Sequence, residues 1–314
     1  PIPSRFGVVG TSGEPAPAWA SEGTEIMREL ERWRGLPFTT DLVVEFREPT
    51  EGGPAGWYEP ETKRLVVTLK GTQRFGRGVM LHEIFHALQD QHFDLSAAHA
   101  KVAGDPDAER SLQAVIEGEA MLAVQELMDY DFSRHAKLPP DGELDEARFD
   151  KVFHYGQGLQ FVLAVRTAKG WDGVGELFAA PPRATSLILF PKRYLTDGAA
   201  PEAAEPPARV ADPDEEPTAE STLGAQGLRL FVARSPETRP HTADLAAAWR
   251  ADRLTELRTP QGPVSEWRLT FVDAASATRF ASVAPLALAA QAGQPPARVV
   301  CDVRGPHVWL RWRK

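Results

Sequence analysis

The residues best suited to chemistry form one short run, His82-Glu83-Ile84-Phe85-His86. If this run is helical, its two histidines lie one turn apart on one face, where both imidazoles can bind a single zinc ion. Glu83 then lies beside the remaining coordination position, where it can accept a proton from water and return it to a leaving amine. The spacing predicts a metal site with His82 and His86 as ligands and Glu83 as the general base.

Two histidines one turn apart can also be a surface pair without a metal. Here the motif follows the apolar run Val79-Met80-Leu81 and continues as Ala87-Leu88, which is typical of a buried helix with one polar stripe. Burying both imidazoles beside a glutamate without a metal would leave polar groups unsatisfied. The metal interpretation is therefore preferred.

A catalytic zinc ion needs a third protein ligand, and the next apolar segment supplies two candidates, Glu117 and Glu119. Helical geometry separates these two acids by about 200 degrees, so both cannot face the metal. Periodicity favours Glu119, which lies nearer the dominant apolar stripe of its segment. Gly118 beside Glu117, however, would permit close approach of the motif helix. Spacing leaves both acids open as the third ligand.

Composition restricts the kinds of site and partner. The 314 residues carry a net charge of -9 spread over short mixed segments, which argues against nucleic acid as a partner. The single cysteine, Cys301, excludes an internal disulfide and a cysteine-based zinc cluster. The sequence has no Asn that could orient a substrate, and no apolar run long enough to span a membrane. A metal site must therefore use histidines and carboxylates.

The compartment is left open by the sequence. The first ten residues lack the charged and then apolar pattern of a signal peptide, and the sequence begins at Pro1. A removed export signal or lipid anchor is compatible with that start, so we favour an extracytoplasmic location slightly over a cytoplasmic one.

Patterning predicts the elements that would position the motif. Helical spacing predicts a helix from Ala18 to Trp33. Alternation predicts strands over Leu42–Phe46 and over Gly56–Leu69, the latter broken by a turn at Pro60. The segment Gly78–Gln91 has helical length and carries the motif. Further helices are predicted at Asp107–Asp131, Leu144–Ala168 and Trp171–Ala179.

The segment Gly198–Ser221 is rich in Ala, Pro, Asp and Glu and has no apolar period, which is typical of a linker. We therefore predict a zinc domain over residues 1–200, a linker over 201–221 and a smaller α+β domain over 222–314. The fold class is α+β. In the last domain, strands are predicted at Arg253–Leu257, Trp267–Val272, Val299–Val303 and His307–Trp312, with helices at Thr242–Trp249 and Ala274–Ser282.

The run from His82 to Phe93, followed by Glu117-Gly118-Glu119-Ala120, resembles a family of largely uncharacterised bacterial HExxH proteins, whose fold implies gluzincin-like metallopeptidases. The resemblance covers roughly residues 55 to 195. In that family the first acid of the Glu-Gly-acid-Ala motif is the expected zinc ligand. The resemblance thus favours Glu117 and makes Glu119 a candidate for supporting the ligands. Further matching positions are Tyr155, Gly158, Phe161, Gly170-Trp171, Pro181-Pro182, Thr185 and Pro191 through Tyr194.

The motif helix also resembles that of thermolysin, where an Asp four residues after the second His supports the site, and Asp90 matches that position. Thermolysin-like enzymes carry another Asp where this chain has Met121, and their substrate-orienting Asn has no counterpart here. The closer family usually carries a Ser-Thr-Glu-Gln stretch and a His-Pro, where this chain has Ala184-Thr185-Ser186-Leu187 and Phe190-Pro191. A polar element of the site is therefore expected to be missing.

Two further features are open to two interpretations each. A gluzincin usually offers a Tyr or His to stabilise an oxyanion, and His154 and Tyr155 are candidates by residue type, although a core or capping role is favoured. The segment Gly56–Leu69 is equally compatible with a core sheet and with the edge strand on which zincins bind an extended peptide.

These patterns predict a zinc-dependent peptidase acting on a peptide or protein substrate. A second hypothesis is a catalytically inactive, zinc-bearing binding or assembly protein on a zincin scaffold, motivated by the residues around Phe190 and the absence of Asn. A third is a zinc hydrolase of non-peptide amides or esters. The substrate and the oligomeric state cannot be named from the sequence.

Overall fold

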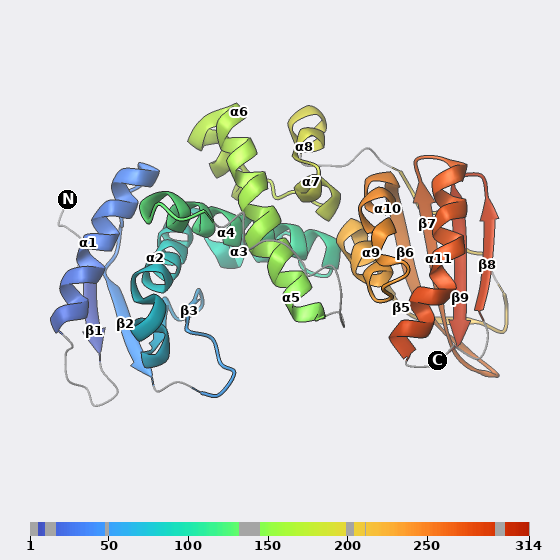
Figure 1. Cartoon of the computed structure of the whole chain (residues 1–314), viewed down its shortest axis with the longest axis horizontal. Coiled ribbons are helices and arrows are strands. Elements are labelled where there is room, and N and C mark those ends of the chain that lie inside the picture. Colours follow the sequence, from blue (N-terminus) through green and yellow to red (C-terminus); the bar gives the residue numbers. More distant parts are fainter. Residues whose placement is uncertain are drawn as a thin grey trace. The chain divides into compact units, whose positions relative to one another are not determined.

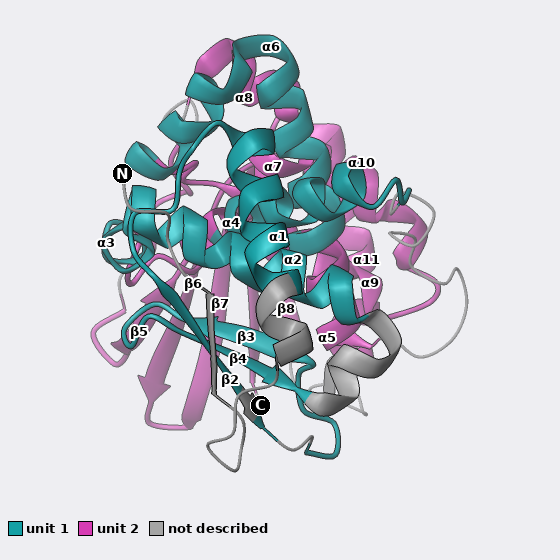
Figure 2. Ribbon diagram, turned by 90° about the vertical axis from the view of Figure 1, so that its left-hand side faces the viewer, with its two compact units in different colours: residues 1–101, 113–136, 154–180 teal, residues 102–112, 137–153, 181–314 magenta. Residues whose placement is uncertain are grey.

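The computed structural model describes residues 6–9, 17–47, 50–131, 145–198, 204–210, 212–292 and 299–313. The chain divides into two compact units, each built from segments far apart in the sequence (Figure 2). Unit 1 comprises residues 1–101, 113–136 and 154–180, and unit 2 comprises 102–112, 137–153 and 181–314. Both units mix helices and strands, so the predicted α+β class is confirmed.

Unit 1 contains a four-stranded sheet of order β1-β2-β4-β3. Its strands are β1 (Phe6–Val9), β2 (Leu42–Arg47), β3 (Gly56–Glu59) and β4 (Arg64–Thr68). β2 pairs in parallel with β1 and β4, whereas β3 is antiparallel to β4 and forms one edge. The two segments predicted from alternation account for β2, β3 and β4, and β1 was not predicted.

The helices of unit 1 are α1 (Pro17–Arg34), α2 (Leu69–Phe93), α3 (Leu95–Ala100), α6 (Gly158–Ala179) and most of α4 (Pro106–Leu127). Of these, α1 and α2 pack directly on the sheet. The core lies between α1, α2, α4 and the strands (Figure 1) and includes Ile26, Leu30, Leu42, Val44, Leu65, Met80, Ile84, Leu88 and Ala123. Each large aliphatic side chain buried there contributes roughly 1.5–3 kcal/mol. This burial holds the motif helix α2 in place.

Helices α4 and α6 touch through their backbones at two glycines. A Cβ atom on Gly118 would lie 2.2 Å from the carbonyl carbon of Gly158, and one on Gly158 would lie 2.1 Å from the carbonyl oxygen of Ala114. Only glycine allows this approach. Gly118 therefore allows the close approach of α6 and not, as predicted from the sequence, that of the motif helix. A π-helical segment, η2 (Val152–Gln157), leads into α6.

Unit 2 contains an antiparallel five-stranded sheet of order β5-β6-β7-β9-β8. Its strands are β5 (Glu216–Ser221), β6 (Trp249–Thr259), β7 (Gly262–Phe271), β8 (Val299–Arg304) and β9 (His307–Arg313). Helices α9 (Gly224–Ala233), α10 (Thr242–Ala248) and α11 (Ala274–Ala292) lie on one side of this sheet (Figure 1). There the Trp267 ring contacts Phe231 and Phe280, with ring centroids 5.1 and 5.7 Å away.

The opposite side of this sheet carries the strap, which we define as residues 204–210. Arg268 and Thr270 alternate with Trp267 along β7 and therefore point to that side. Arg268 Nη1 donates to the carbonyl oxygen of Pro207 at 3.2 Å, and Thr270 Oγ1 donates to that of Glu205 at 3.0 Å. The predicted linker, residues 201–221, thus contains a docked segment and strand β5. The division into units also differs from a boundary near residue 200, because residues 181–314 all belong to unit 2.

Short elements account for most of the differences from the predicted pattern. The remaining elements of unit 2 are α5 (Glu146–Lys151), α7 (Thr185–Leu189), α8 (Pro191–Asp197) and η3 (Arg239–His241). Of these, α7, α8 and η3 were not predicted, and neither was α9. None of the described helices combines the length and hydropathy needed to cross a bilayer.

Candidate metal centre

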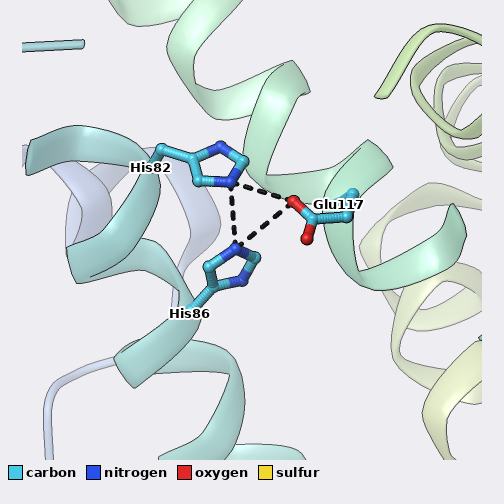
Figure 3. Close-up of side chains that lie close together, drawn as sticks. All are labelled: His82, His86 and Glu117. Atoms are coloured by element: carbon cyan, nitrogen blue, oxygen red, sulfur yellow. Dashed lines mark hydrogen bonds and ion pairs between the residues drawn. The ribbon is translucent and has the colours of Figure 1, made fainter. Parts of the chain in front are cut away.

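Two histidines of α2 and one glutamate of α4 point at a common centre (Figure 3). His82 Nε2 lies 3.0 Å from His86 Nε2, and the two rings stand nearly perpendicular with centroids 4.5 Å apart. Glu117 Oε2 lies 2.9 Å from His82 Nε2 and 3.5 Å from His86 Nε2. The i, i+4 spacing of the histidines thus has the predicted consequence, because both imidazoles share one face of α2.

The donor set fits a metal ion in both chemistry and size. Its three donor atoms lie within 4.8 Å of one another. A tetrahedral ion with ligands at about 2.1 Å separates neighbouring donor atoms by about 3.4 Å, close to the 2.9–3.5 Å found here. Two imidazoles and a carboxylate also form a donor set that catalytic zinc uses. The group can therefore hold a metal ion with only small shifts.

Glu119 points away from this centre. Its side chain is fully buried, and its carboxylate accepts hydrogen bonds from Arg34 Nε at 2.7 Å and from Gln89 Nε2 at 2.9 Å. Periodicity alone had favoured this acid as the third ligand. The structure instead brings Glu117 to the histidines and directs Glu119 toward α1.

The expected general base, Glu83, is buried beside the histidines and against the edge strand β3. It has a hydrogen bond with the Tyr58 backbone, and a Cβ on Gly56 would lie 3.2 Å from Glu83 Cγ. Burial raises the pKa of Glu83, the charges of His82 and His86 oppose that rise, and the charge of Glu117 adds to it. The carboxyl group is therefore a stronger base than an exposed glutamate.

Among the three candidate ligands, the negative charge of Glu117 is in contact with the imidazoles of His82 and His86. Burial lowers the pKa of His86, but hydrogen bonding and attraction to Glu117, together with the charge of Glu83, raise it to about 9. Burial raises the pKa of the Glu117 carboxyl, but its hydrogen bonds to His82 and His86 hold that pKa well below the usual range. The centre thus favours a positive charge between these groups, which a proton or a metal ion can supply.

The residue expected to support the histidines, Asp90, has another role. Its buried carboxylate accepts hydrogen bonds from Tyr58 Oη at 2.8 Å, from Lys63 Nζ at 2.5 Å and from the backbone of Leu95 at 3.1 Å. It therefore anchors the β3–β4 hairpin to α2. The side chain that contacts His86 is that of the preceding residue, Gln89, whose Oε1 lies 2.8 Å from His86 Nδ1.

Tyr155 reaches the centre, although a core or capping role had been favoured for it. Its ring centroid lies 5.7 Å from that of His82, and its hydroxyl forms a hydrogen bond with Glu117. Burial raises the pKa of Tyr155, and the charges of Glu117 and Glu83 and the bond to Glu117 raise it further. The segment η2 carries this tyrosine, and π-helical turns are frequent at functional sites.

Two residues behind the ligands, Gln89 and Arg34, were not predicted from the sequence. Gln89 did carry a signal, because a polar residue three positions after His86 shares its helix face. Arg34 carried none, since it ends a helix far away in the sequence and meets the site only through tertiary packing.

Comparison with protein-family models, with curated proteins and with solved structures gives no match. The resemblance to bacterial HExxH proteins stays a prediction. The geometry of His82, His86, Glu117 and Glu83 is what bears on function.

Proposed function

We propose that this protein is a zinc-dependent peptidase of the gluzincin type, with His82, His86 and Glu117 as ligands and Glu83 as the general base. The observation that carries the proposal is the convergence of three donor atoms from α2 and α4 within 4.8 Å. Glu83 follows His82 directly and lies beside the same centre. Two histidines with a glutamate from a later helix form the ligand set of thermolysin-type enzymes.

Each residue around the centre has a defined part in hydrolysis. A bound zinc ion would supply Lewis acidity, which lowers the pKa of water and polarises a substrate carbonyl. Glu83 takes the proton of the attacking water and delivers it to the leaving nitrogen, and its raised pKa suits both transfers. The raised pKa of Tyr155 keeps its phenol protonated and able to donate a hydrogen bond to a developing oxyanion.

The edge strand β3 supports a peptide as the substrate. The Thr68 amide donates to the Ala55 carbonyl at 2.9 Å, so alternate residues of β3, Gly56 and Tyr58, direct their backbone groups away from β4. The backbone of Tyr58 forms a hydrogen bond with Glu83, which places this edge beside the general base. An extended peptide that adds to the edge would bring its backbone to the same place.

The proposal is tested with Glu83→Gln, which keeps the shape of the side chain and removes the base. Wild-type protein and variant are loaded with zinc and incubated with a peptide library, and new termini are identified by mass spectrometry. We expect cleavage by the wild type and a loss of at least about a hundredfold in the variant. Zinc content should stay the same, because Glu83 is not a ligand.

The matched control is Glu45→Gln, an acid on the inner strand β2 whose partner is Arg47. This variant should cleave like the wild type. Undiminished cleavage by Glu83→Gln would contradict the proposed base.

One observation favours the second candidate, a zinc-bearing binding or assembly protein without activity. The ligand side chains are only 10–12% exposed, which leaves little access for a substrate. Zinc binding by the wild type with no cleavage of any library peptide would support this candidate instead.

A further inference from the structure

The ligand His86 is held from behind by a chain of buried polar side chains. Its Nδ1 lies 2.8 Å from Gln89 Oε1, on the ring edge opposite the candidate metal centre. Gln89 Nε2 then donates to Glu119, and Glu119 pairs with Arg34. This series of hydrogen-bonded side chains runs from α2 through α4 to α1, and all of its residues belong to unit 1.

The orientation of the Gln89 amide fixes the direction of these bonds. Its Nε2 faces two oxygens, the carbonyl of Ile116 at 3.1 Å and the carboxylate of Glu119 at 2.9 Å. Since only the NH₂ group can donate to both, the amide oxygen must face His86. The proton of a neutral His86 is therefore on Nδ1, and the lone pair of Nε2 is directed at Glu117 and His82.

Glu119 and Arg34 strengthen this arrangement. The anionic Glu119 polarises the Gln89 amide, which makes its oxygen a better acceptor for the imidazole N–H. Arg34 compensates the buried charge at 2.7 Å, and its guanidinium stacks on Trp171 at 4.4 Å from the ring centroid. The amide group is thus fixed on both sides, so rotation that would present its NH₂ to His86 is disfavoured.

We propose that Gln89 is a positioning residue that sets the metal affinity of the centre by holding His86 in the tautomer with its lone pair on Nε2. Glu119 and Arg34 act through Gln89. The proposal rests on the proposed metal site, and it gives the Gln89 amide the supporting role that a carboxylate fills in other zinc sites.

The test measures the zinc dissociation constant of the full chain by competition with a chromophoric chelator. Gln89→Leu removes the acceptor at similar volume and should weaken zinc binding about 10- to 100-fold. The matched control is Asp90→Asn, the adjacent buried residue, whose partners are Tyr58, Lys63 and the Leu95 amide. This variant should keep the wild-type zinc constant.

A double variant separates positioning from packing. In Gln89→Glu/Glu119→Gln the amide and the carboxylate change places, so the new carboxylate accepts from His86 while the new amide donates to it and accepts from Arg34. Zinc affinity should equal or exceed that of the wild type. The melting temperature should fall, because the Ile116 carbonyl loses its donor. Gln89→Glu alone places two carboxylates in contact and should lower the melting temperature.

The ¹⁵N shifts of the His86 ring in metal-free protein at high pH supply a readout independent of activity. They should report Nδ1–H in the wild type and a mixture of tautomers in Gln89→Leu. If the wild type binds no zinc, the proposed metal site is wrong. If the wild type binds zinc and Gln89→Leu binds it equally well, only the role of Gln89 is overturned.

Discussion

The two units both bury carboxylates, but they surround them with different partners. In unit 1, Glu117 meets the Nε2 atoms of two imidazoles. In unit 2, the fully buried carboxylate of Asp252 accepts four N–H groups at 2.8–3.1 Å. These donors are the backbone amides of Leu223 and Gly224 and the indoles of Trp249 and Trp267.

The difference shows what distinguishes a candidate metal centre from a structural acid. Asp252 is satisfied by donors that cannot lose their protons, so it needs no cation. Glu117 faces imidazole nitrogens, each of which offers either a proton or a lone pair depending on its charge and tautomer. Burial of an acid is common to both units, and the partner groups decide which of them can bind a metal.

The largest expected effect is the loss of zinc binding when Glu117, the buried acid of unit 1, is substituted. Glu117→Gln should weaken zinc binding by more than about a hundredfold, because losing a ligand exceeds the effect of losing its support. Zinc at 100 times its wild-type dissociation constant stabilises the folded protein by about 2.7 kcal/mol, so it should raise the melting temperature of the wild type but not of Glu117→Gln.

Asp252→Asn is the control for this comparison. It should lower the melting temperature, because an amide cannot accept all four N–H groups, and yet keep the zinc-dependent rise. Loss of the rise in Asp252→Asn, or its persistence in Glu117→Gln, would show that the two acids are not different in kind.

The parts of the fold that could be predicted from the sequence are those with long, regular patterns. The period of α1 and the alternation of β2 agree with the structure because one side of each element faces the core. Short helices such as α7 have too few turns to show a helical period. Strand β5 could not be predicted because its segment consists largely of Pro, Ala and acids whose side chains are mostly exposed. Composition alone could not reveal that the strap docks through its backbone carbonyls.

The site could be predicted where one helix determines the geometry. His82 and His86 follow from i, i+4 spacing, whereas the choice between Glu117 and Glu119 depends on which neighbours α4 meets on each side. Both acids are buried, one against the histidines and the other against Arg34. The periodicity of α4 favoured Glu119, so it could not identify Glu117 as the acid that faces the histidines.

The next effect concerns the pH dependence of stability in unit 2. Burial raises the pKa of Asp107 to about 7, hydrogen bonds from Thr185 oppose the rise, and the charge of Asp252 adds to it. The folded protein therefore holds this proton more tightly than the unfolded chain, whose pKa is near 3.8. The resulting stabilisation is complete below about pH 4 and is lost as the pH rises through about 7.

Asp107→Asn removes this titration, so the free energy of unfolding of the variant, relative to that of the wild type, should rise by about 2.6 kcal/mol from pH 5 to pH 8. Urea unfolding at both pH values measures the gain. Zinc affinity should not change with this substitution, because Asp107 belongs to unit 2. A stability difference that is the same at both pH values would mean that Asp107 keeps an ordinary pKa.

The smallest effects compare single hydroxyl groups that donate to a buried aspartate in each unit. In unit 2, Thr185 Oγ1 donates to Asp107 at 2.6 Å and accepts from the Gln226 amide at 2.9 Å. Thr185→Val keeps the shape of the side chain, but Asp107 loses a donor and the Gln226 backbone amide loses its acceptor. We expect a loss of about 2 kcal/mol in the free energy of unfolding.

In unit 1, Tyr58 Oη donates to Asp90, and Tyr58→Phe removes that bond alone. Asp90 keeps two donors, the Lys63 ammonium and the Leu95 amide, so the expected loss is smaller, about 1 kcal/mol. Urea unfolding of both variants near neutral pH measures the two losses in the free energy of unfolding. If Tyr58→Phe were the more damaging change, the β3–β4 hairpin would depend on this one bond, and the Lys63 contact would contribute little to anchoring the edge strand beside Glu83.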